Sequence, residues 1–111
     1  MFYNPEIGHN LPHDPFKAIV SPRPIGWIST IDKEKNVNLA PYSFFNAIAD
    51  NPPMIMFSIT GQKKNISSKD TLQNIIETKC FVVNVVGKDL LHQMNQTSGN
   101  YPKNTDEFIL A

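Results

Sequence analysis

Residues 22–30 read PRPIGWIST and residues 38–46 read NLAPYSFFN. Both segments otherwise predict β-strands, yet each also carries proline, flat aromatic residues and short hydroxyl or amide side chains. A strand that only fills a core does not need this combination. We therefore expect the two segments to hold a flat, polar, aromatic ligand.

Further strands are expected on either side of these segments. The predicted strands are residues 17–20, 25–31, 37–42 with a kinked continuation over 44–48, 54–59, and 81–86. Residues 54–59 are apolar on both faces, which predicts a central position in the sheet. The charged residues 32–36 predict a hairpin connection, and Asp50-Asn51-Pro52-Pro53 predicts a break.

Two short helices complete the predicted domain. Asp70 has the position of a helix cap, and Asp89 is expected to cap the second helix. The apolar stripe expected to face the sheet consists of Leu72, Ile75 and Ile76. The stripe of the second helix consists of Leu90, Leu91 and Met94. With residues 1–15 as an irregular lead-in and 61–68 and 95–107 as polar loops, residues 16–111 predict a mostly antiparallel sheet that closes toward a barrel.

Charge and length exclude several classes of protein. The 111 residues are enough for one small domain or part of one, and ten basic side chains cancel ten acidic ones. No large field of one sign is therefore available to attract nucleic acid or an anionic membrane, and no apolar run approaches the roughly 18 residues of a membrane-spanning helix. The N-terminus lacks the features of a secretory signal. The single cysteine, Cys80, is expected to be a small buried residue, and its isolation indicates a cytoplasmic location.

Other site chemistries find little support. His9 and His13 are four residues apart, but Pro12 and Pro15 disrupt the helix that would bring them together, so no metal site is expected. The chain has no Gly-rich nucleotide-binding loop and no Ser–His–Asp set.

Ordinary structural roles remain open for some residues of the two segments. Trp27 and the Phe44–Phe45 pair are also compatible with a core. Arg23 is different, because it lies between two prolines and a rigidly presented guanidinium usually has an anionic target.

Together, these residues resemble the flavin reductase-like family of FMN-binding split-barrel proteins. The resemblance is carried by residues 22–32, 38–46, 50–53, 69–71 with Asn74, and 81–84. It implies a mostly β Greek-key split barrel that forms a homodimer, binds FMN near the subunit interface and exchanges electrons between NADH or NADPH and the flavin.

The resemblance also assigns site residues. Those implied to lie against the isoalloxazine ring are Arg23, Pro24, Ile25, Gly26, Trp27 and Ser29 in the first segment, and Ala40, Pro41, Tyr42, Ser43, Phe44, Phe45 and Asn46 in the second. Lys69 and Thr71 are implied to meet the phosphate. Hydride passes directly to the flavin in such enzymes, so no catalytic acid or base is nominated.

Length is the main departure from the family. Members are usually much longer, and residues 106–111 correspond to roughly their middle. We therefore expect the chain to be truncated, with the N-terminal portion of the domain and an incomplete barrel that a downstream polypeptide could complete. The alternatives to an enzyme are an FMN-binding module without catalysis and a remnant without activity.

Overall fold

The fold is built from five strands and several short helices. A computed structural model describes residues 2–60, 70–102 and 105–111. The strands are β1 (Gly26–Ile31), β2 (Val37–Tyr42), β3 (Phe45–Asp50), β4 (Pro53–Phe57) and β5 (Val82–Asn84). The helices are α1 (Phe16–Ile19), α2 (Asp70–Thr78), the 3-10 helix η1 (Lys88–Leu90), α3 (Leu91–Gln96) and α4 (Glu107–Leu110).

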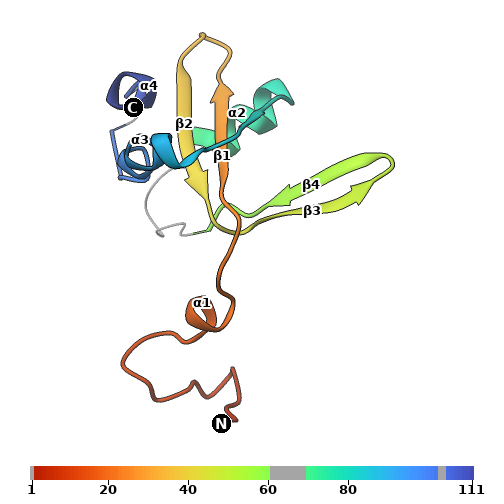
Figure 1. Cartoon of the computed structure of the whole chain (residues 1–111), viewed down its shortest axis with the longest axis vertical. Helices are drawn as coiled ribbons and strands as arrows, with labels where there is room; N and C mark the ends of the chain where they lie inside the picture. Colours follow the sequence, from red (N-terminus) through yellow and green to blue (C-terminus); the bar gives the residue numbers. More distant parts are fainter. Residues whose placement is uncertain (1, 61–69, 103–104) are drawn as a thin grey trace.

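Two separate antiparallel sheets result. Strand β1 lies between β2 and β5, while β3 pairs with β4 in a two-stranded ribbon that projects from the rest (Figure 1). The predicted mostly β, antiparallel fold with a few short helices is confirmed. As expected for an incomplete barrel, the strands of the described residues do not close on themselves.

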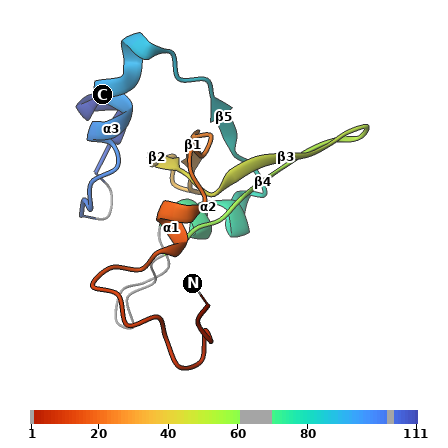
Figure 2. The same ribbon diagram turned by 60° about the horizontal axis from the view of Figure 1, so that its bottom comes forward.

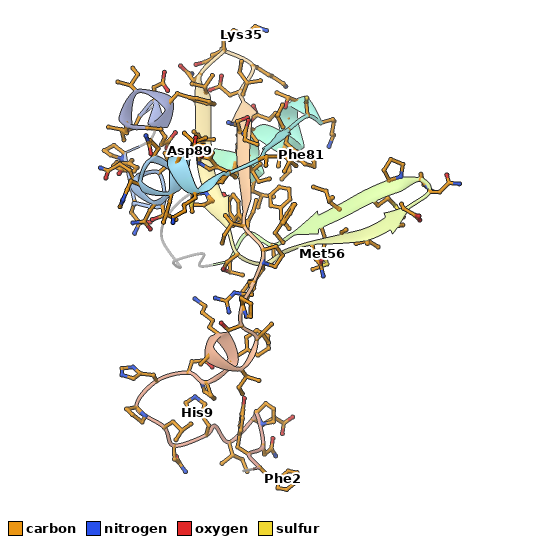
Figure 3. All side chains as sticks on the ribbon, in the orientation of Figure 1. Phe2, His9, Lys35, Met56, Phe81 and Asp89 are labelled. Atoms are coloured by element: carbon orange, nitrogen blue, oxygen red, sulfur yellow. The ribbon has the colours of Figure 1, made fainter. Side chains whose placement is uncertain are left out.

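The β1–β2 hairpin follows the predicted alternation. Its register runs from Gly26 opposite Tyr42 to Ile31 opposite Val37. At the turn, Asp32 Oδ1 accepts the backbone N–H groups of Glu34 at 2.8 Å and Asn36 at 2.9 Å. Lys35 adopts a left-handed φ of 74° at the hairpin tip, where Figure 3 labels it.

Alternation along β1 gives the sheet two different faces. Trp27 and Ser29 point to one face, and Ile28 and Thr30 point to the other, as predicted. Helix α2 covers the Thr30 face, and the segment from η1 to α4 lies on the Trp27 side (Figures 1 and 2). Ile28 and Leu39 are fully buried between these layers.

The buried residues of helix α2 are polar rather than members of its apolar stripe. The buried residues of α2 are Thr71 and Asn74, whereas Ile76 is 52% exposed. Asn74 Nδ2 donates to Thr30 Oγ1 at 3.0 Å. Of the three residues predicted to face the sheet, Ile76 is exposed, so its prediction is wrong, whereas Leu72 and Ile75 are half-buried. The opposing strands present hydroxyl and amide groups that a polar helix face can satisfy.

The predicted strand at residues 17–20 is also wrong, because this segment belongs to helix α1. Pro15 precedes the helix with helical dihedral angles, φ −74° and ψ −16°. Asp14 Oδ1 accepts the backbone N–H of Phe16 at 2.9 Å, which satisfies one of the donors at the start of the helix. Among the described residues, no strand pairs with this short apolar run, and it forms a single helical turn instead.

The β3–β4 ribbon corrects a further expectation. Strand β4 pairs with β3, and Met54, Ile55 and Met56 are exposed, so the predicted central position is wrong. Figure 3 labels Met56 on this ribbon. Strand β4 is apolar on both faces, yet it lies in a ribbon that extends away from the three-stranded sheet and is not covered on two sides.

Two smaller expectations fail for local reasons. Asp89 lies inside η1, and neither η1 nor α3 has a side-chain cap. Cys80 is exposed rather than buried, because it lies in the connection between α2 and β5. The predicted loop at residues 61–68 lies outside the described residues.

A buried hydrogen bond joins the end of α3 to the sheet. The indole Nε1–H of Trp27 donates to Thr97 Oγ1 at 2.9 Å, and Thr97 Oγ1 donates to the carbonyl oxygen of Met94 at 2.8 Å. Thr97 is almost fully buried. Its hydroxyl therefore satisfies one donor and one acceptor that water cannot easily reach.

We expect Thr97→Val to lower the free energy of unfolding by about 1–3 kcal/mol, because it leaves the Trp27 indole N–H without an acceptor. Thr97→Ser keeps the hydroxyl and should lose much less. Urea unfolding followed by fluorescence measures both, since Trp27 is the only tryptophan. Equal losses for the two variants would show that packing of the methyl group, and not the hydrogen bond, stabilises this contact.

Candidate functional site

The two segments singled out in the sequence meet at the end of the β1–β2 hairpin opposite its turn. Gly26 lies opposite Tyr42, and a Cβ on Gly26 would be 2.5 Å from Cδ2 of Phe45. Only glycine lets the Phe45 ring approach the backbone of β1 so closely. The guanidinium carbon of Arg23 lies 5.7 Å from the centre of the Phe44 ring. These contacts bring Arg23, Gly26, Tyr42, Phe44 and Phe45 together.

Arg23 also secures the lead-in to β1. Its Nη1 donates to the carbonyl oxygens of Lys17, at 2.5 Å, and Val20. Its Nε is buried and has no hydrogen-bond partner among the described residues. An acceptor oxygen at this position would satisfy a donor that is otherwise costly to bury.

An aromatic cluster lies next to this hairpin end. The ring centres of Tyr42 and Phe57 are 5.4 Å apart, and those of Phe57 and Phe81 are 5.2 Å apart. Such tilted and edge-to-face contacts are favourable arrangements for aromatic pairs. They fix the Tyr42 ring from the β4 side.

Thr71, predicted to meet a phosphate, is nearly inaccessible at the first turn of α2. Its Oγ1 accepts hydrogen bonds from Asn38 Nδ2 and from the hydroxyl of Tyr42, both at 2.8 Å. Burial raises the pKa of the Tyr42 phenol, and the nearby carboxylates of Glu107 and Asp70 raise it further, so the phenol keeps its proton. Lys69 lies outside the described residues, and the phosphate role of both residues stays a prediction.

Trp27 and Ser29 lie apart from the other ring-binding candidates. They point to the sheet face opposite Tyr42, so one flat ring cannot stack on the faces of both Trp27 and Tyr42. Ser29 Oγ accepts from Asn84 Nδ2 at 3.1 Å, and the same Asn84 Nδ2 donates to the carbonyl oxygen of Trp27 at 3.0 Å.

Trp27 instead lines an open cleft of about 580 Å³. The other lining residues are Leu39, Val83, Asn84, Val85, Leu90, Gln93, Phe108 and Ala111. The cleft is largely apolar, with the two amide side chains as its polar groups. Sequence reasoning did not anticipate it, because its lining residues come from six separate elements, namely β1, β2, β5, η1, α3 and α4.

The remaining candidates lie in or beside the paired segments. Pro24 and Ile25 are exposed before β1, Ala40 and Pro41 are half-buried in β2, and Ser43 follows β2 in a bend. Asn46 is exposed, and its side-chain oxygen accepts the backbone N–H of Ala47 at 2.9 Å. The assignment of these residues to a ring site stays a prediction.

Glu107 is an important residue that sequence reasoning missed. Its Oε2 accepts the backbone N–H of Leu39 at 3.1 Å, so a carboxylate satisfies a donor on the free edge of β2. Glu107 is buried, and desolvation raises its pKa, with Asp70 and Asp106 adding to the effect while the Leu39 N–H opposes it. A single charge after a polar loop carries no periodic signal that could reveal this contact.

The described residues show neither a metal-binding cluster nor a membrane-spanning helix. Over residues 2–60, 70–102 and 105–111, no group of three or more His, Cys, Asp or Glu side chains is arranged to hold a metal ion. Within the same ranges, none of the helices has the length and apolar character needed to cross a membrane.

Comparison with known proteins assigns the family. Residues 20–111 match the family model of the flavin reductase like domain, and the chain belongs to this family. A protein from Aquifex aeolicus is 44% identical over 94 residues, which are 85% of this chain and 47% of that protein. The chain spans about half the length of the curated relatives it matches.

Solved structures show the same fold. Nitrilotriacetate monooxygenase component B from Bacillus cereus is 35% identical, with a TM-score of 0.82 over 99% of this chain and 54% of that one. A split barrel domain protein from Shewanella frigidimarina is 28% identical, with a TM-score of 0.68 over 79% of this chain and 41% of that one. The split-barrel class expected from the sequence is thereby confirmed.

The raised pKa of Glu107 predicts a pH-dependent stability. In the folded protein this carboxyl holds its proton to a higher pH than in the unfolded chain, so its contribution is full below the unfolded pKa and is lost as pH rises through the folded pKa. Glu107→Gln resembles the protonated form and should escape this loss. Wild type and variant should therefore have similar unfolding free energies at about pH 4, and the variant should be the more stable protein at about pH 8.

Urea unfolding at several pH values measures this difference. Glu34→Gln, in the exposed turn of the β1–β2 hairpin, is the matched control and should show no such divergence. A difference between wild type and Glu107→Gln that stays constant with pH would contradict the prediction.

Proposed function

We propose that this chain is the FMN-binding part of a flavin reductase-type oxidoreductase that transfers electrons between NADH or NADPH and the flavin. The observation that carries the proposal is the buried Nε of Arg23, which has no hydrogen-bond partner in the part of the chain that the structure describes. It lies beside the Phe44 ring, where the two segments predicted to bind a ligand meet. Family membership supports the flavin, and the name of the Bacillus cereus relative supports oxidoreductase chemistry.

The residues at the hairpin end suit a flavin. Arg23 offers a fixed donor to an oxygen of the ring or its side chain, and the aromatic side chains of Phe44, Phe45 and Tyr42 offer apolar contact. Thr71 and the first turn of α2 would hold the phosphate, because the unpaired N–H groups at a helix start favour an anion. When bound, FMN supplies the electron-accepting ring, and the task of this chain is to bind and orient it.

A homodimer in the cytoplasm belongs to the same proposal. A two-stranded ribbon is marginally stable alone in water, and the β3–β4 ribbon exposes Ile48, Met54, Ile55 and Met56. We propose that a second copy contributes to covering it. The matched part of the Bacillus cereus structure is accompanied by further chain, so a polypeptide that completes the barrel is proposed as a partner as well.

We expect Arg23→Ala to weaken FMN binding by about 10- to 100-fold, because a hydrogen bond from a charged donor is removed. Arg23→Lys keeps the charge but loses the Nε donor, and its loss should be intermediate. Fluorescence titration with FMN gives the dissociation constants. Lys17→Ala, which removes an exposed cation in α1, is the control and should bind as wild type. Unchanged affinity in both Arg23 variants would remove Arg23 from the site.

Anaerobic addition of NADH or NADPH tests the enzymatic part of the proposal. If the chain loaded with FMN accepts hydride from a nicotinamide, the absorbance of oxidised flavin should disappear with at least one donor. Persistence of that band with both donors would instead identify an FMN-binding module without catalysis.

A further inference from the structure

Helix α1 has few interactions of its own to hold it in place. It is a single turn of four residues, and none of them is buried. Phe16 is 54% exposed and Ile19 is 72% exposed. Because one isolated helical turn is unstable in water, α1 depends on contacts with the rest of the chain.

Arg23 supplies such a contact at the end of the helix. Its Nη1 donates to the carbonyl oxygens of Lys17 and Val20, which lie where the carbonyl groups of a helix lack partners within it. A ring contact supports the same docking, since the Phe16 ring lies edge-on to the Phe44 ring with 6.1 Å between their centres. Helix α1 is thus attached to the hairpin end where the flavin site is proposed.

The guanidinium of Arg23 can hold α1 and a ligand at the same time. In this planar group Nη1 lies on the side of Cδ, whereas the Nε hydrogen points to the opposite side. Nη1 is bonded to α1, and the buried Nε has no hydrogen-bond partner among the described residues. One side of Arg23 is therefore bound to the helix, and the other carries the donor that the proposed flavin site uses.

We propose that α1 and the flavin are coupled through Arg23. The carbonyl oxygens of α1 hold the guanidinium where its Nε can donate to the flavin, and a bound flavin in turn restrains Arg23 and so orders α1. The inference rests on the proposed function, and it gives an exposed helix outside the site a role in setting flavin affinity. By thermodynamic linkage, the factor by which formation of α1 raises flavin affinity equals the factor by which the flavin stabilises α1.

Affinity measurements test the coupling from the side of the helix. Ile19→Pro removes the N–H that donates to the Pro15 carbonyl oxygen at 2.9 Å, and so breaks α1 at an exposed position. It should weaken FMN binding by about 3- to 10-fold in fluorescence titration. In the Arg23→Ala background it should have no further effect, because the link is already cut. Ile7→Pro removes an N–H bonded to the Asn4 carbonyl oxygen in the exposed lead-in, and this matched control should bind as wild type.

Ala18→Gly loosens α1 more gently, so the test stands even if Ile19→Pro disturbs the fold. Glycine has a lower helix propensity than alanine, and the substitution removes only an exposed methyl group. We expect FMN affinity to fall by about 2- to 5-fold, again only while Arg23 is present.

Hydrogen exchange tests the coupling from the side of the flavin. The backbone N–H groups of Ile19 and Val20 donate within this turn, so their exchange rates report the opening of α1. FMN at a saturating concentration should slow both rates by about 5-fold or more in the wild-type chain, and it should not slow them in Arg23→Ala. Helix α4, which is also four residues long, is the control, and the exchange rate of its Ile109 N–H should change little.

Three results would overturn the inference while leaving flavin binding intact. Ile19→Pro could weaken FMN binding equally in the wild-type and Arg23→Ala backgrounds, which would show that α1 acts by another route. Ile19→Pro and Ala18→Gly could both leave the affinity unchanged, or FMN could slow exchange equally in α1 and α4. Failure of the folded wild-type chain to bind FMN would instead overturn the proposed function, and the inference with it.

Discussion

The register of the β1–β2 hairpin is the constraint on which the rest of the structure depends. A shift of one residue would reverse the faces of one strand relative to the other, so Thr30 in β1 and Asn38 and Tyr42 in β2 could no longer all face α2. The hydrogen bonds from Asn74 to Thr30 and from Asn38 and Tyr42 to Thr71 are possible only in the observed register. The polar layer under α2 and the pairing of β1 with β2 therefore specify each other.

This polar layer matters because the apolar core is small. Among the described residues, the buried apolar side chains are those of Trp27, Ile28, Leu39 and Tyr42. Buried hydroxyl and amide groups contribute modestly when they are paired, but leaving one unpaired is costly. The layer thus fixes which face of helix α2 packs on the sheet, which burial of so few apolar side chains would not do alone.

Sequence patterns predicted the strands better than the surfaces between elements. Alternation placed Trp27 and Ile28 on opposite faces correctly, because the strand period is a local property. The same reasoning missed that Thr71 and Asn74 are the buried residues of α2 and placed the exposed Ile76 against the sheet, since an apolar stripe was assumed to face the core. That assumption fails when the opposing strand face is polar. Glu107 could not be predicted either, because its partner is a backbone N–H 68 positions away that only the fold brings near.

The two faces of the sheet constrain where a flat ligand can lie. Trp27 faces the apolar cleft and Tyr42 faces α2, so a ring placed on either face would contact only one of these two aromatic residues. At the open end of the hairpin the constraint is relaxed, because Arg23 and Phe44 lie beyond the paired strands and the Phe45 ring packs directly against the backbone of Gly26. A flavin proposed at this end would reach α2 through Tyr42 and Thr71. The ring and phosphate assignments, made from different segments of the sequence, are therefore compatible with one continuous site at a strand end rather than on a sheet face.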